Sequence, residues 1–71
     1  MVRTEGNRII LEGNLGADAQ GALVSIFQLT QKLGYQDIVF DFSNVQYVDA
    51  NLMLSLSSYA AYYRLNQFDF H

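Results

Sequence analysis

Cysteine and proline are both missing from this sequence of 71 residues, and its only histidine, His71, is the last residue. Disulfide bonds and zinc sites built from Cys and His are therefore excluded, and nothing indicates an oxidising compartment. No apolar run approaches the roughly 20 residues of a membrane span, and residues 1–7 lack the pattern of a signal peptide. We therefore expect a cytoplasmic protein that does not insert into a membrane.

Charge is also scarce, because charged residues make up 15% of the sequence and hydrophobic residues 51%. Four basic residues are scattered among seven acidic ones, which gives a net charge of -3. Nucleic acid and anionic membrane surfaces are poor partners for such a chain. A chain this short buries only about 60% of the surface that it exposes when unfolded. We therefore expect a single domain, residues 1–71, whose apolar surface is completed by a protein partner or by a homodimer.

Glycine and asparagine separate the predicted elements. The first half of the chain is expected to contain two short strands and a loop, at residues 1–4, 8–12 and 13–16. Apolar residues at helical spacing then predict a helix from Ala19 to Leu33, with Asp18 as its N-cap and Gly34 as its stop signal. Val24 and Phe27 fall away from the apolar stripe of this helix, so we expect both on the surface.

The second half begins with a nearly continuous apolar run at residues 38–42, which predicts a central strand covered on both faces. Residues 45–48 are expected to form a connection, and Asp49 to cap a helix over residues 50–65. Residues 67–71 begin a further strand. Since helices separate the later strands, this order predicts an α/β fold with a mixed, mostly parallel sheet of four to five strands and two helices on one face.

The second predicted helix has apolar residues on two sides. Its core face is expected to hold Leu52, Met53, Leu56, Tyr59, Ala60 and Tyr63. On the reverse side Leu54, Ala61 and Leu65 align with Ser58 and Tyr62. This outer stripe has two explanations: it binds a partner, or further chain covers it.

Residues 38–56, read as IVFDFSNVQYVDANLMLSL, resemble the signature of STAS domains, the family of sulfate-transporter C-terminal domains and anti-sigma factor antagonists. That signature is an apolar strand ending in Asp-Leu-Ser, a short apolar link, and Asp-Ser-Ser-Gly-Leu at the start of a helix. Asp41-Phe42-Ser43 matches its first part, and the five residues from Asp49 to Met53 match its last part. Residues 11–15 are similar to the strand, glycine and loop that lie upstream in the family.

The sequence departs from that signature at its most important position. In the antagonists, a serine follows the motif aspartate, and its phosphorylation by a partner kinase breaks the complex. Ala50 stands at this position and Asn51 beside it, so the resemblance implies a domain without this phosphorylation switch. Leu52 replaces the usual glycine. The family's last helix has no counterpart, so we expect a shortened domain or a fragment of one.

Two features offer weak alternatives to a binding function. Asp41 and Asp49 would flank one loop as a carboxylate pair, but we expect both to have structural roles, as a loop ligand and a helix cap. Gly13, Gly16 and Gly21 do not fit a nucleotide-binding spacing and are expected to be turn or packing glycines. Because the loop has no nearby His, Cys or Lys, we expect no catalysis, no cofactor and no metal.

We therefore expect a regulatory protein-binding domain that resembles the anti-sigma factor antagonists. Its partner would be an ATPase-like kinase or a larger signalling complex. The alternative is a structural subunit or domain of a sulfate or lipid transport complex, a role in which STAS domains also serve. The residues expected to contact the partner are Ser43, Asn44, Asp49, Ala50, Asn51, Met53, Leu54, Ser58, Ala61, Tyr62 and Leu65.

Overall fold

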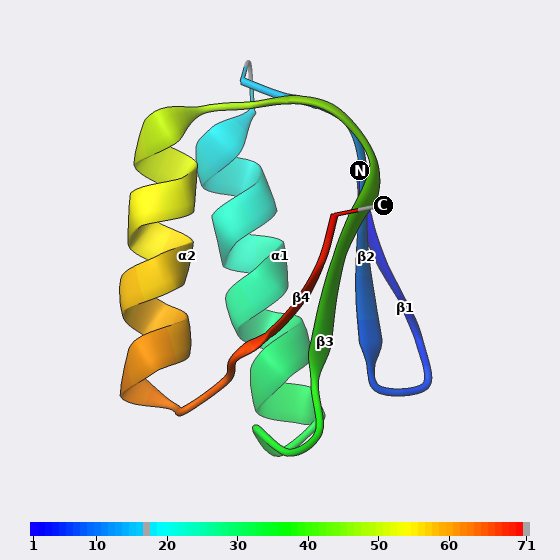
Figure 1. The fold of residues 1–71 in the computed structure, drawn as a ribbon, viewed down its shortest axis with the longest axis vertical. Coiled ribbons are helices and arrows are strands. Elements are labelled where there is room, and N and C mark those ends of the chain that lie inside the picture. The colour runs from blue at the N-terminus through cyan, green and yellow to red at the C-terminus, as the bar shows by residue number, and fades with distance from the viewer. Residues whose placement is uncertain (17, 71) are drawn as a thin grey trace.

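A computed structural model of the chain describes residues 1–16 and 18–70 and shows an α/β fold. Figure 1 shows the path of the chain from an N-terminal hairpin through two strand-helix units to a short last strand. The elements are β1 (Val2–Glu5), β2 (Arg8–Leu15), α1 (Ala19–Lys32), β3 (Val39–Val48), α2 (Ala50–Tyr62) and β4 (Gln67–Asp69). The last predicted strand therefore exists, although its expected end at His71 lies outside the described residues. Within those residues, neither helix is long and apolar enough to cross a membrane.

The four strands form one mixed sheet in the order β1-β2-β3-β4. β1 and β2 are antiparallel, whereas β3 is parallel to both of its neighbours, β2 and β4. The sheet is thus only partly parallel, and β3 occupies the interior position predicted for it. Both helices lie against the same face of the sheet, also as predicted (Figure 1).

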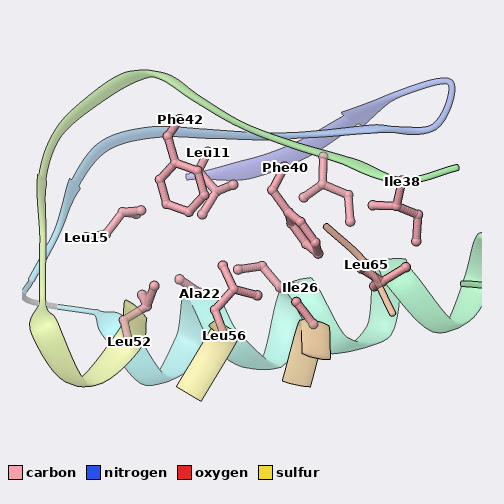
Figure 2. Close-up of a cluster of buried hydrophobic side chains, with 12 residues drawn as sticks. Leu11, Leu15, Ala22, Ile26, Ile38, Phe40, Phe42, Leu52, Leu56 and Leu65 are labelled. Atoms are coloured by element: carbon pink, nitrogen blue, oxygen red, sulfur yellow. The ribbon is translucent and has the colours of Figure 1, made fainter. Parts of the chain in front are cut away.

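The prediction that apolar elements cover β3 on both faces is wrong, because no helix among residues 1–16 and 18–70 lies on the other face of the sheet (Figure 1). Phe40 and Phe42 point toward the helices (Figure 2). Asp41 lies between them on the strand and so faces the open side. It is nevertheless buried, with 9% of its surface exposed, because the side chain of Arg8 lies against it at 3.0 Å. On the open face, this part of β3 is therefore covered by the ion pair of Arg8 and Asp41 instead of by a second apolar layer.

The core fills the space between the sheet and the helices (Figure 2). Each of the four longer elements supplies side chains that are almost completely buried. They include Leu11 and Leu15 from β2, Ile26 from α1, Phe40 and Phe42 from β3, and Leu52 and Leu56 from α2. Burying a side chain of this size contributes about 1.5 to 3 kcal/mol to folding, so this single layer of contacts is the main source of stability.

The two helix starts differ, although each has an aspartate at the N-cap. Asp49 has an extended backbone, and its carboxylate accepts hydrogen bonds from the N–H groups of Asn51 and Leu52 at 2.9 and 3.3 Å. Asp18 precedes α1 with φ -126° and ψ 46°, and its side chain makes no capping hydrogen bond. An N-cap side chain reaches the first turn from an extended backbone. The cap predicted for α2 is therefore confirmed, whereas Asp18 is at the N-cap without capping α1 through its side chain.

Two predicted loops are parts of strands. Residues 13–15 belong to β2 and residues 45–48 to β3, where Gly13 pairs with Val45 and Leu15 with Val48. The parallel register shifts twice along this pair, so β3 has two more residues than β2 over the same length. Such bulges bend a strand and interrupt its regular alternation, which explains why the sequence pattern of residues 45–48 does not indicate a strand.

Two apolar residues predicted on the surface are buried or partly buried. α2 ends at Tyr62, earlier than predicted, and Arg64 has a positive φ of 60° that reverses the chain. Leu65 therefore turns back into the core, with 6% of its surface exposed. On α1, Phe27 packs against Tyr59 of α2 with ring centroids 4.3 Å apart. Val24, by contrast, is 52% exposed, as expected.

Candidate protein-binding site

The structure brings most of the predicted partner-binding residues to the surface around α2. Those that are exposed are Asn44, Ala50, Asn51, Leu54, Ser58, Ala61 and Tyr62. Ser43, Asp49 and Met53 are half-buried. Leu65 is the exception, because its place in the core removes it from any outer surface. The predicted outer stripe therefore consists of Leu54, Ser58, Ala61 and Tyr62, and we call these four residues the α2 face.

The α2 face has large apolar groups and no charge. Leu54 is 68% exposed and Tyr62 is 80% exposed, and their eight-residue spacing places them on one side of the helix. No charged residue occurs anywhere in α2, from Ala50 to Tyr62. Protein interfaces are depleted in charged residues at their centre and enriched in aromatic ones. Tyr62 and the absence of charge fit that pattern, whereas Ser58 and Ala61 are of types that interfaces contain less often.

Tyr62 lies at the border of a cluster of aromatic rings at the end of the two helices. Its ring meets that of Tyr63 edge-on, at 4.9 Å, and Tyr63 stacks on Tyr35 at 3.9 Å. The hydroxyl of Tyr59 contacts both Tyr35 and the buried Thr30. The hydrogen bond between Tyr59 and Tyr35 raises the pKa of the Tyr35 hydroxyl above its usual value. The packed rings of Tyr35, Tyr59 and Tyr63 give the exposed ring of Tyr62 an ordered neighbour.

Most of the charge lies on the opposite side of the molecule, on the open face of the sheet. There Arg3 binds Glu5 at 2.7 Å and Glu12 at 3.0 Å. Arg8 binds Asp41 at 3.0 Å and Asp69 at 3.2 Å, and so connects β2 to β4 across β3. These six residues include the majority of the charged side chains in the chain.

Asp41 is the most constrained member of this network. Its carboxylate accepts hydrogen bonds from the backbone N–H of Ser43 at 2.9 Å and from the Ser43 hydroxyl at 2.6 Å. The bonds from Ser43, together with Arg8, lower the pKa of Asp41 below its usual range. The structural roles predicted for Asp41 and Asp49 are confirmed, because Asp41 accepts a hydrogen bond from the N–H of Ser43 and Asp49 accepts two from N–H groups of α2. The partnership with Arg8, 33 residues away, has no local sequence signal.

A second surface feature lies where β3 meets the start of α2. It is an open hollow of about 430 Å³, lined mainly by Phe42, Val45, Tyr47, Val48, Met53 and Phe70. A smaller hollow, of about 120 Å³, lies between the N-terminus and the start of α1. Among residues 1–16 and 18–70, no group of three or more His, Cys, Asp or Glu side chains is arranged to hold a metal ion.

No protein-family model, curated protein or solved structure matches the chain. The resemblance of residues 38–56 to STAS domains therefore remains a prediction from the sequence. The function proposed below depends on that resemblance and on the surface around α2.

Proposed function

We propose that this chain is a non-catalytic regulatory domain of the STAS type that binds another protein through the α2 face and the adjoining end of β3. The partner best suited to it is an ATPase-like kinase or anti-sigma factor, as for the antagonists that the sequence resembles. The observation that carries the proposal is the α2 face itself, a surface with two exposed large apolar side chains on a helix without charge.

The resemblance and the geometry support the same surface. The motif residues Asp49, Ala50 and Asn51 form the first turn of α2 and its cap, directly beside the α2 face. The Asp49 carboxylate holds two N–H groups of that turn, so the position of Ala50 is fixed and its side chain is exposed. A partner on the α2 face would therefore also contact Ala50, where an antagonist has its phosphorylated serine.

The methyl side chain of Ala50 supports an unswitched complex. A phosphate adds roughly two negative charges and disrupts an apolar interface. Ala50 has no hydroxyl to receive one, so the complex would be insensitive to a kinase at this position. The same observation favours the alternative function, a structural subunit or domain of a sulfate or lipid transport complex, because a permanent assembly needs no such switch.

Affinity capture from native cells with matched surface variants tests the proposal. The wild-type chain, Leu54→Glu and Val24→Glu would be immobilised in parallel, and the captured proteins identified by mass spectrometry. Leu54 and Val24 are both exposed apolar residues on the outer sides of their helices, so each variant adds the same charge to a different helix. We expect a partner that binds the wild-type chain and Val24→Glu but is lost with Leu54→Glu.

The identity of that partner separates the two functions. An ATPase-like kinase or a sigma-factor regulator supports the antagonist type, whereas a permease or a transport ATPase supports the structural subunit. A partner retained equally by Leu54→Glu and the wild-type chain would contradict binding through the α2 face.

A further inference from the structure

β3 is much longer than the strand beside it. It has ten residues, but β4 pairs only with Val39, Phe40 and Asp41. On its other side, β2 pairs with β3 as far as Val48. In the part of the chain that the structure describes, no strand therefore lies along residues 44–48 on the β4 side. An exposed strand edge presents backbone N–H and C=O groups that bind a further extended segment.

The hollow described above lies along this unpaired edge. Phe70 forms one wall and stacks on Phe42, with ring centroids 5.2 Å apart. Phe70 and Tyr47 are 62% and 57% exposed, although both line the hollow. Figure 2 shows Phe42 on the helix side of the sheet, and Met53, which also lines the hollow, belongs to α2. A strand added to β3 would place every second side chain on this side, and an apolar one would fill the hollow.

Charge restricts which segments suit the edge. Residues 42–48 carry no charge. Of the two flanking carboxylates, Asp41 pairs with Arg8, and Asp49 accepts hydrogen bonds from the first turn of α2. The whole chain has a net charge of -3, so the surrounding potential favours a neutral or basic segment. A second copy of the chain would bring the same negative charge and is less suited to the edge.

We infer that residues 44–48 of β3 bind an extended segment of a partner protein by strand addition. The segment has apolar side chains at alternate positions, one of which enters the hollow beside Phe70, and basic residues at its ends. Backbone hydrogen bonds give the affinity in this mode and the hollow gives the specificity. Residues 44–48 adjoin the α2 face but are not part of it, so the inference holds even if Leu54, Ser58, Ala61 and Tyr62 bind nothing.

Titration with a defined peptide, followed by NMR on the isotopically labelled chain, tests the inference. The probe is a capped peptide, Lys-Val-Thr-Val-Thr-Val-Thr-Lys, which matches the length of a typical strand. Its control has the same sequence with N-methyl groups on alternate backbone nitrogens, which removes hydrogen-bond donors and leaves the side chains unchanged. We expect saturable shifts at the amides of residues 44–48 and Phe70, and at least about a tenfold loss of affinity for the methylated peptide.

Amide hydrogen exchange and two variants complete the test. Edge amides of residues 44–48 should exchange rapidly in the free chain and become protected when the probe binds. Phe70→Ala should weaken binding severalfold, whereas the matched variant Val24→Ala, on α1, should not. The inference is overturned by an absence of shifts at millimolar probe, by equal binding of the methylated peptide, or by shifts confined to α2 or β1. Protection that increases with protein concentration, without probe, would identify a second copy as the occupant and also overturn it.

Discussion

The open face of the sheet carries paired charged side chains, whereas the outer surface of α2 carries exposed apolar ones. On the sheet face, Arg3 and Arg8 each hold two carboxylates, and the apolar Ile10 beneath them is only 5% exposed. On α2 the arrangement is the reverse, because Leu54 and Tyr62 are exposed to solvent on a helix that contains no charged residue. Although the chain has few charged residues, the majority of them lie on the open face of the sheet.

The difference indicates which side of the molecule has its interactions satisfied within the chain and which side is free to bind a partner. An uncovered sheet face with exposed apolar side chains favours aggregation, and charged side chains on that face reduce its apolar area. The sheet face has that protection and is internally paired. The α2 face lacks it. We therefore expect substitutions on the sheet face to affect stability, and substitutions on the α2 face to affect binding.

The largest expected effect is that of Asp41→Ala. The substitution leaves the Ser43 N–H without its acceptor and removes a partner of Arg8, in a site where Asp41 is 9% exposed. Loss of a buried acceptor costs about 1 to 3 kcal/mol, which urea denaturation would measure. Glu5→Ala is the control, because Glu5 is an exposed partner of Arg3, and such pairs contribute little to stability. Equal urea midpoints for the two variants would show that Asp41 contributes no more to stability than an exposed ion-pair partner such as Glu5 does.

Acid should produce a partial version of the same effect. Because the folded state lowers the pKa of Asp41, its carboxylate contributes stability above the pKa of an unfolded aspartate, about 3.9. That contribution is lost as the pH falls from there through the lower folded pKa, because protonation removes the charge that Ser43 and Arg8 bind. Urea midpoints measured across this acid range should fall more steeply for the wild-type chain than for Asp41→Asn. Parallel curves would show that Asp41 is not linked to folding in this way.

The smallest effect on stability is expected at the α2 face. Leu54→Glu and Tyr62→Glu change exposed side chains and bury no charge. Surface substitutions of this kind usually alter the free energy of unfolding by less than about 0.5 kcal/mol, and glutamate is a good helix former. The same urea measurements should therefore give midpoints close to that of the wild-type chain. A large loss for either variant would mean that the α2 face is needed for the fold.

The sequence predicted those parts of the structure that are set by neighbouring residues. Asp49 caps α2 because its carboxylate reaches N–H groups two and three residues away. Gly34 follows α1 because its φ of 75° suits glycine. The interior position of β3 followed from the apolar run at residues 38–42, and the exposure of Leu54 and Tyr62 from helical periodicity.

The remainder depends on contacts that are distant in the sequence. Residues 45–48 are strand only because β2 pairs with them through two bulges. Arg8 meets Asp41 through the parallel pairing of β2 and β3, which no local pattern encodes. Leu65 lies in the core and not on the predicted outer stripe, because α2 and its helical periodicity end at Tyr62. Phe27 is partly buried and not on the surface as predicted, because it packs against Tyr59 on the other helix.

The most direct test of the central claim is the footprint of the captured partner on the isotopically labelled chain. Once the partner is purified, cross-saturation NMR would report which amides lie in the interface. We predict saturation at Ala50, Leu54, Ser58, Ala61 and Tyr62, and none at Arg3, Arg8 or Asp69 on the open face of the sheet. Saturation of the sheet face with the α2 face unaffected would contradict the account, because the charged and internally paired surface would then be the one that binds.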